Sequence, residues 1–258
     1  MCITPSGTSS GALKGCALKS VVVTSYSMEK ITVIIPALNE AGNIRQLVAE
    51  VHQAVAVPVE VIVVDNGSTD ATAAEALAAG ARVVSEPRRG YGYACAAGTA
   101  AAQDAEVLAF LDGDFSFLPS ELPALLAPIL AGQADLVLGS RPLGGITPGA
   151  MLLQQRFGNW LVSRAMNALY GLSLTDLGPY RAIRRALLLD LHLQEMTFGW
   201  PAEMMVKAVR RGARLVEVPV SYHSRRAGNS KVSGTLRGTL LAGWYILGVT
   251  LRYAGRGK

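Results

Sequence analysis

The sequence predicts an α/β protein: a doubly wound, mainly parallel sheet with helices on both faces, in a single domain. The first observation is a series of short apolar segments, each of the length of a buried strand. They occupy residues 31–35, 59–64, 81–85, 105–111 and 135–139. The second is that a stretch of helical length separates most of them. The third is that polar side chains follow these segments, at the ends of strands where such sheets bind ligands.

Length and composition are compatible with one well-filled domain. The chain has 258 residues, half of them hydrophobic, which suffices for a large core and excludes a mostly disordered protein. The formal net charge of +5 suits an anionic small substrate, a membrane surface or nucleic acid, so charge alone selects no partner. The three cysteines show no CxxC spacing, which argues against a disulfide framework or zinc knuckle and favours a reducing cytoplasm.

The two ends of the chain are predicted to differ from the domain between them. Residues 1–28 are rich in Ser, Thr and Gly and lack the apolar core of a signal peptide, so we predict a disordered leader before a domain over 29–234. Residues 235–258 are predicted to form a C-terminal apolar and basic helix. No segment has the ~18 unbroken apolar residues of a transmembrane helix. The final helix therefore either packs on the domain or lies peripherally at the inner face of the membrane.

Periodicity and end signals predict the helices of the first half. Apolar residues recur at helical spacing over 44–55. Asp70 is placed to cap the Ala-rich helix that follows it, and Gly80 to end that helix. Further helices are predicted over 90–103, after a glycine-rich start, and over 118–131.

After Arg141 the pattern changes. The sequence predicts a Gly/Pro loop over 142–149 and then a long helix over 151–170. The later elements are a strand at 180–183, a helix at 202–210, a strand at 215–222 and a basic loop at 224–233. These segments contain no second core, so we expect them to complete one sheet and cover its crevice.

Asp112 and Asp114 directly follow an apolar strand and are the strongest candidates for chemistry. Residues two apart on extended backbone share a face, so the two carboxylates are predicted to lie close together. Such a pair repels unless a proton or a cation lies between its members. Mg2+ or Mn2+ takes a few protein carboxylates and completes its shell with water and substrate phosphate. An isolated Asp-Gly-Asp turn is more often only solvated, but its position in a chain of β/α units favours a metal–diphosphate site.

Six segments occur in order along the chain: 34–40 (IIPALNE), 63–70 (VVDNGSTD), 90–94 (GYGYA), 112–114 (DGD), 139–141 (GSR) and 225–231 (RRAGNSK). In this order they resemble the family 2 glycosyltransferases, especially the subgroup around dolichyl-phosphate mannosyl- and glucosyltransferases. Asn66 stands where the family often has a second Asp, and Ser116 where the mannosyl enzymes often carry Gln. Each segment is weak alone, but six in the family's order make a specific match over about residues 31–240.

The resemblance implies a GT-A type, Rossmann-like nucleotide-sugar domain and inverting transfer of a hexose from a UDP- or GDP-linked donor, assisted by Mg2+ or Mn2+. On the donor side it implies an apolar slot for the base at Pro36, Leu38 and Val64, and polar contacts with base and ribose from Glu40, Asp65 and the Gly67 turn. It also implies that Arg88 or Arg89 neutralises diphosphate charge, and that Asp112 and Asp114 hold the metal, with Asp114 the more direct ligand.

On the acceptor side the resemblance implies a phosphate-bearing molecule, such as polyprenyl or dolichyl phosphate, and no nucleic acid. The candidate phosphate ligands are Arg141, Arg156, Arg225, Ser230 and Lys231, since guanidinium groups bind phosphate oxygens bidentately. An anionic acceptor needs no strong base. A hydroxyl acceptor does, and Asp176 and Glu203 are then the candidates. Glu203 lacks the second acid that other family members place beside this position.

Other functions are weighed against this one. A glycosyltransferase with a soluble hydroxyl acceptor, using Asp176 or Glu203 as base, is the nearest alternative, and a non-catalytic nucleotide-sugar-binding module is one of another class. Residues 90–95 also resemble the glycine-rich fingerprint of a dinucleotide-binding Rossmann dehydrogenase. Cys95 replaces its third Gly, and the segment lies in the third β/α unit whereas the fingerprint belongs in the first, so this function is disfavoured. A nucleotidyltransferase would need a Gly-rich basic loop after the first strand, which residues 36–40 do not offer.

Overall fold

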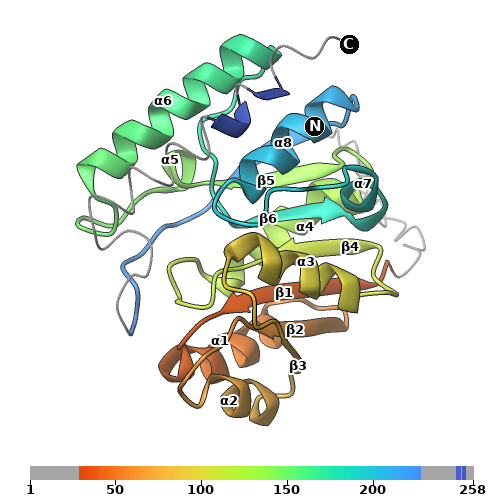
Figure 1. The fold of residues 1–258 in the computed structure, drawn as a ribbon, viewed down its shortest axis with the longest axis vertical. Helices are drawn as coiled ribbons and strands as arrows, with labels where there is room; N and C mark the ends of the chain where they lie inside the picture. The colour runs from red at the N-terminus through yellow and green to blue at the C-terminus, as the bar shows by residue number, and fades with distance from the viewer. Residues whose placement is uncertain (1–28, 228–247, 251, 254–258) are drawn as a thin grey trace, which may run out of the picture.

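A computed structural model of the protein describes residues 29–227, 248–250 and 252–253. Within this part, seven strands form one sheet in the order β3-β2-β1-β4-β6-β5-β7 (Figure 1). The strands are β1 (Ile31–Ala37), β2 (Val59–Asp65), β3 (Arg82–Ser85), β4 (Val107–Phe110), β5 (Leu136–Ser140), β6 (Arg181–Arg184) and β7 (Leu215–Pro219). All run in one direction except β6, which is antiparallel to both neighbours. The predicted mainly parallel sheet in a single domain is confirmed.

The helices alternate with the strands through most of the chain. They are α1 (Ala41–Ala54), α2 (Thr72–Ala78), α3 (Tyr91–Ala101), the 3-10 turn η1 (Pro119–Glu121) that leads into α4 (Leu122–Leu130), α5 (Arg141–Gly144), α6 (Leu153–Tyr170), α7 (Arg185–Asp190) and α8 (Trp200–Arg210). The predicted end of α2 is confirmed, since Gly80 follows the C-cap Ala79 in the left-handed conformation with φ +88°. The predicted cap is not, because the N-cap is Ala71 and has no side-chain cap hydrogen bond; Asp70 lies one residue earlier and accepts from the backbone N–H of Thr72 at 3.0 Å.

The alternation of side chains along each strand divides the core into two layers. In β4, Val107 and Ala109 belong to one buried cluster, and Leu108 and Phe110 to the other. The first cluster is closed by apolar residues of α1 and α4, and the second by those of α3, α6 and α8. Helices therefore cover both faces of the sheet, as predicted (Figure 1).

The reversed strand β6 decides which loops reach the ligand-binding edge. It pairs with β4 on one side and β5 on the other. Since β6 is antiparallel, its start lies where β4 and β5 end. The turn at residues 175–180, just before β6, is thereby brought to the edge formed by the carboxyl ends of the parallel strands.

Two short helices were not predicted. α5 replaces the start of the expected Gly/Pro loop, because the Ser140 hydroxyl caps it by accepting from the backbone N–H of Leu143 at 3.3 Å. α7 follows β6 directly. Most of the predicted basic loop and final helix lies outside the described residues. In the part of the chain that is described, no helix is long and apolar enough to cross a membrane.

Candidate active site

The carboxyl ends of β1, β2 and β4 bring the predicted donor-side segments together. Ala37 pairs with Asp65, and Ile34 with Phe110, so the turn after β4 lies beside the end of β1. The contact is close at Gly113, where a Cβ would lie 3.3 Å from the Pro36 carbonyl oxygen. The close approach places Asp112 and Asp114 next to the loop that carries Glu40.

Side-chain hydrogen bonds join the β1–α1 loop to the β2–α2 loop. The Asn39 side chain accepts from the backbone N–H of Thr69 at 2.8 Å, and the Asn39 backbone N–H donates to the Ser68 hydroxyl at 2.9 Å. Asp65 accepts from the backbone N–H of Ser68 at 3.0 Å. Asn39 has φ +52°, a left-handed conformation that asparagine tolerates better than most residues. The two loops therefore form one unit around Asp65.

Asp112 and Asp114 lie in different electrostatic environments. The pKa of Asp112 is raised to about 7 because burial disfavours its charged form and because Asp114 adds a second negative charge nearby, although part of the Asp112 surface stays accessible. Asp114 instead accepts two hydrogen bonds from Ser116, from the backbone N–H at 2.9 Å and the hydroxyl at 2.6 Å. The intervening Phe115 has φ +60°, which is strained for an aromatic residue. Ser116 had appeared only as a departure from the family pattern, and its contact with Asp114 gives it a positioning role.

Arg225 bridges two of the predicted donor-side carboxylates. Its Nη2 atom lies 2.8 Å from Asp114 Oδ2 and 3.0 Å from Glu40 Oε1. The Glu40 side chain is buried, and Arg225 is itself largely covered. Sequence reasoning placed Glu40 with the nucleotide and Arg225 with the acceptor phosphate. In the structure they lie together, because Arg225 contacts both Glu40 and Asp114.

Arg141 and Asp176 form a second charge pair at the same edge. Arg141 Nε and Nη2 donate to the two Asp176 carboxylate oxygens at 2.7 and 2.6 Å, and the Arg141 backbone N–H adds a third bond at 2.9 Å. Asp176 is fully buried. Burial lowers the pKa of Arg141, but the bonds to Asp176 outweigh it, so the net pKa is raised and the guanidinium stays charged. Both Asp176 oxygens, proposed from the sequence as a possible base, are engaged by this cation.

Asn66 fastens the β2–α2 loop to the segment before α3. Its Nδ2 donates to the backbone carbonyls of Glu86 and Arg88 at 2.8 and 2.7 Å, and its Oδ1 accepts from the Gly90 N–H at 3.0 Å. Both amide functions are used, which an Asp side chain at this position could not do because it has no N–H donor. The Arg88 guanidinium pairs with Glu86 at 2.7 Å and lies over the Tyr93 ring.

The remaining donor-side candidates differ in exposure. Pro36 and Leu38 are partly exposed at the end of β1. Val64 is fully buried in the core cluster on the α3 side of the sheet. Gly67 has φ +78°, and the Arg89 guanidinium lies against it, donating to the Gly67 carbonyl at 2.8 Å.

The acceptor candidates are only partly brought together. Arg141 and Arg225 lie at the strand-end edge, and both act electrostatically on Asp112. Arg156 is exposed on α6. Ser230 and Lys231 fall outside the described residues.

Glu203 lies in α8 and is engaged on both carboxylate oxygens. One oxygen accepts from the backbone N–H groups of Gln194 and Glu195 at 2.8 and 2.7 Å. The other contacts Lys207 Nζ at 2.8 Å and the Tyr253 hydroxyl at 2.7 Å. Burial raises the pKa of Glu203, but these hydrogen bonds outweigh it, and the net pKa is lowered. The carboxylate thus ties α8 to the preceding loop and to the C-terminal turn.

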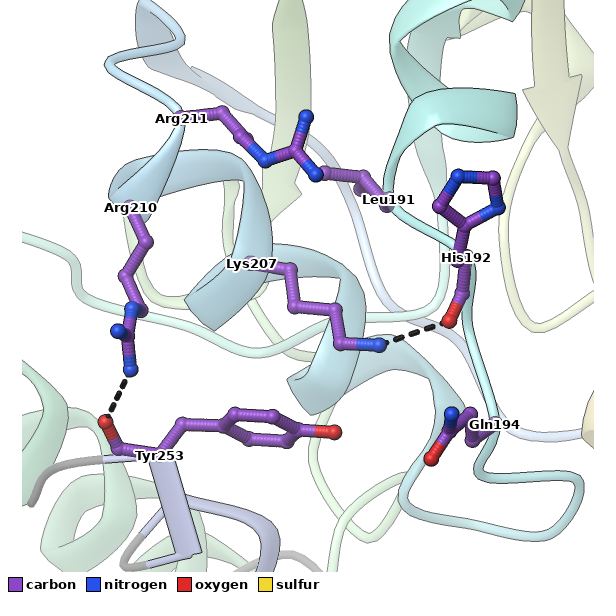
Figure 2. A pocket seen from close by; sticks show the side chains of 7 residues that line it. All are labelled: Leu191, His192, Gln194, Lys207, Arg210, Arg211 and Tyr253. Carbon is purple, nitrogen blue, oxygen red and sulfur yellow. Dashed lines mark hydrogen bonds between the residues drawn. The ribbon is translucent and has the colours of Figure 1, made fainter. Parts of the chain in front are cut away.

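A cavity of about 310 Å3 adjoins Glu203 and lies apart from the strand-end edge. Figure 2 shows Lys207 and Arg210 of α8 reaching the backbone carbonyls of His192 and Tyr253, at 2.8 and 2.6 Å. The other residues that line the cavity are Leu191, Gln194 and Arg211. The cations in this cavity already serve to hold local structure.

The strand-end carboxylates fit a divalent cation. Two carboxylates meet at the end of β4, and the pKa of one is raised because the other adds negative charge, so a cation there is favourable. Among the residues that the structure describes, no three His, Cys, Asp or Glu gather into a metal cluster. Mg2+ fits such a site, because it is commonly held by one or two carboxylates together with substrate phosphate and water.

Comparison with known proteins gives consistent results. Residues 32–191 match the model of glycosyl transferase family 2. An uncharacterized glycosyltransferase of Mycobacterium tuberculosis is 40% identical over 215 residues, 83% of this chain and 94% of that protein. The undecaprenyl-phosphate mannosyltransferase of Micrococcus luteus is 33% identical over 251 residues, 88% of this chain and 97% of that protein.

A solved structure extends the likeness to the fold. It is glucosyl-3-phosphoglycerate synthase from Mycobacterium tuberculosis in complex with Mn2+, uridine diphosphate and phosphoglyceric acid. The TM-score is 0.70 at 26% identity, covering 89% of this chain and 80% of that one. The expected GT-A fold is thereby confirmed. The family model spans more than half of the chain, and the chain belongs to glycosyl transferase family 2.

Proposed function

We propose that this protein is a metal-dependent, inverting hexosyltransferase that moves a hexose from a UDP- or GDP-linked donor to a phosphate-bearing acceptor, with polyprenyl phosphate as the acceptor class. One observation carries the proposal: the Asp112/Asp114 pair and the Arg141 and Arg225 guanidinium groups occupy one edge of the sheet. The carboxylates suit a metal-bound diphosphate, and the guanidinium groups suit a second phosphate.

On the donor side, Asp112 and Asp114 would hold Mg2+ or Mn2+. When bound, the cation supplies Lewis-acid neutralisation of the diphosphate that leaves. Ser116 keeps Asp114 oriented through its two hydrogen bonds. Asp65 and Glu40 would contact the nucleoside from two loops that are joined to each other by hydrogen bonds.

On the acceptor side, a phosphate oxygen would attack the anomeric carbon. The new carbon–oxygen bond forms as the bond to the donor diphosphate breaks, and the electron pair leaves with the nucleoside diphosphate. Because the acceptor is already anionic, no proton has to be removed. The engagement of Asp176 by Arg141 and of Glu203 by four donors supports this route, since neither carboxylate has an oxygen without a donor.

The relatives support both halves of the proposal. The Micrococcus relative is named for transfer to undecaprenyl phosphate, and the solved neighbour contains Mn2+, uridine diphosphate and a phosphate-bearing acid. The shared feature is a phosphate on the acceptor.

The test is a transfer assay with labelled UDP- and GDP-hexoses, Mn2+ and undecaprenyl phosphate. We expect label in the organic phase, with the anomeric configuration inverted. Label only in a water-soluble hydroxyl compound would favour the alternative acceptor and would require Asp176 or Glu203 as base. Donor binding without transfer or hydrolysis under any of these conditions would favour a non-catalytic nucleotide-sugar-binding module.

A further inference from the structure

The outer side of α6 carries an exposed apolar stripe. Leu153, Phe157, Trp160 and Leu161 have exposed fractions of 79%, 61%, 54% and 44%. Their spacing of three and four residues puts them on one face of the helix, together with Arg164. The opposite face, with Val162 and Met166, packs into the core. We call these four residues and Arg164 the α6 outer face.

The α6 outer face is not an ordinary scatter of surface apolar residues. Ten large hydrophobic side chains are exposed in the described part of the chain, and seven of them fall within residues 143–169. Single exposed hydrophobics are normal, whereas a contiguous group marks a contact surface. The Phe157 and Trp160 rings lie 5.7 Å apart, and the Arg164 guanidinium lies 5.9 Å from the Trp160 ring, so these side chains form a contiguous group. In Figure 1 α6 runs along the outer edge of the molecule.

Charge selects the kind of partner. Residues 141–170 contain Arg141, Arg156 and Arg164 and no Asp or Glu. A helix with exposed Trp, Phe and Leu, flanked by arginines and without acidic residues, has the composition of an interfacial helix on an anionic bilayer. Tryptophan favours the headgroup level, and arginine can extend from an apolar face to lipid phosphates.

The same helix is tied to the candidate active site. Asn159, on the inner side of α6, accepts from the Leu177 backbone N–H at 3.2 Å and donates to the Thr175 carbonyl at 3.4 Å. Between these two residues lies Asp176, which holds Arg141. A surface that contacts α6 is therefore next to the arginine that we assign to the acceptor phosphate.

From these observations we propose that the α6 outer face docks on the surface of an anionic lipid bilayer and presents the Arg141 side of the site to it. The role of this docking rests on the proposed function, because an acceptor phosphate that is linked to a lipid lies at the surface of a bilayer. The docking itself depends only on the exposed face and its charge.

The test measures sedimentation of the full chain with vesicles of phosphatidylcholine containing about one-third phosphatidylglycerol, without polyprenyl phosphate or donor. The matched pair is Leu161→Glu and Leu189→Glu, the same change at two helix positions that are each 44% exposed, in α6 and α7. We expect Leu161→Glu and Phe157→Glu to weaken vesicle binding by ~10-fold or more, and Leu189→Glu to leave it unchanged. Equal binding by the matched variants, with equal melting temperatures, would overturn the proposal.

Two further readouts separate the outcomes. Sedimentation velocity without lipid would reveal a dimer that Leu161→Glu dissociates, which would assign the face to a second copy and overturn the lipid proposal. A short-chain, water-soluble isoprenyl phosphate tests catalysis away from vesicles. If the wild-type protein glycosylates it but does not bind vesicles, the docking inference fails while the proposed function stands. If the protein binds vesicles through α6 but transfers no sugar to either acceptor, the function fails and the docking stands.

Discussion

Asp112 and the two candidate bases, Asp176 and Glu203, have opposite surroundings. Asp112, at the end of β4, has a raised pKa because it is buried beside Asp114, whose own oxygens accept from Ser116 and Arg225. Asp176, in the turn before β6, and Glu203, in α8, are more deeply buried, and each is surrounded by donors. The first arrangement favours binding of a cation, whereas the second holds loops in place. Residue type and burial alone therefore do not identify a catalytic acid or base, and the nearest donors decide.

The strongest test of this comparison is Asp114→Ala. Removal of a carboxylate that would hold the metal against the diphosphate should lower kcat by about 10^2- to 10^3-fold, with little change in melting temperature. Asp104→Ala, at an exposed side chain, is the matched control. Full activity in Asp114→Ala, measured with the same donor and Mn2+, would contradict the metal role.

The second test is Asp176→Asn. The substitution leaves the buried Arg141 guanidinium without its anion, so we expect the free energy of unfolding to fall by about 3–5 kcal/mol and the acceptor KM to rise. Denaturant unfolding and steady-state kinetics measure the two effects. If Asp176 were the base, kcat would fall instead and stability would change little.

The third test is Glu203→Gln. The amide keeps the shape but weakens bonds to Lys207 and two backbone N–H groups, so stability should fall by about 1–3 kcal/mol while kcat per folded molecule is retained. Tyr253→Phe, which removes one partner of the same carboxylate, should cost about 1 kcal/mol. A large loss of kcat in Glu203→Gln without loss of stability would support Glu203 as the general base.

The smallest effect concerns an exposed pair far from the site. Arg214 lowers the pKa of Asp135 to about 2, chiefly through its side-chain hydrogen bonds, from a usual value of 3.8. A lowered pKa stabilises the fold above pH 4 and loses that contribution as pH falls through 4 towards 2. Asp135→Asn should flatten the stability profile over this window by less than ~1 kcal/mol, because the Arg214 side chain is half exposed. An unchanged acid limb in urea unfolding would show that the pair contributes nothing.

Local signals account for what could be predicted from the sequence. Strand patterns depend only on neighbouring residues, as in the apolar runs of β1, β2 and β4 and the polar turns after them. The strands, their order as β/α units and the position of Asp112 and Asp114 could therefore be predicted from the sequence. Gly80, which ends α2, belongs to the same class of local signal.

Long-range contacts account for the rest. The reversed direction of β6 brings Asp176 to the ligand-binding edge, and no local pattern encodes strand direction. Arg225 reaches Glu40, 185 residues away in the chain, and Tyr253 reaches Glu203, 50 residues away. The sequence by itself determined which residues carry charge at the strand ends. Only the tertiary structure decided which of those charges meet each other, because that depends on how distant segments pack.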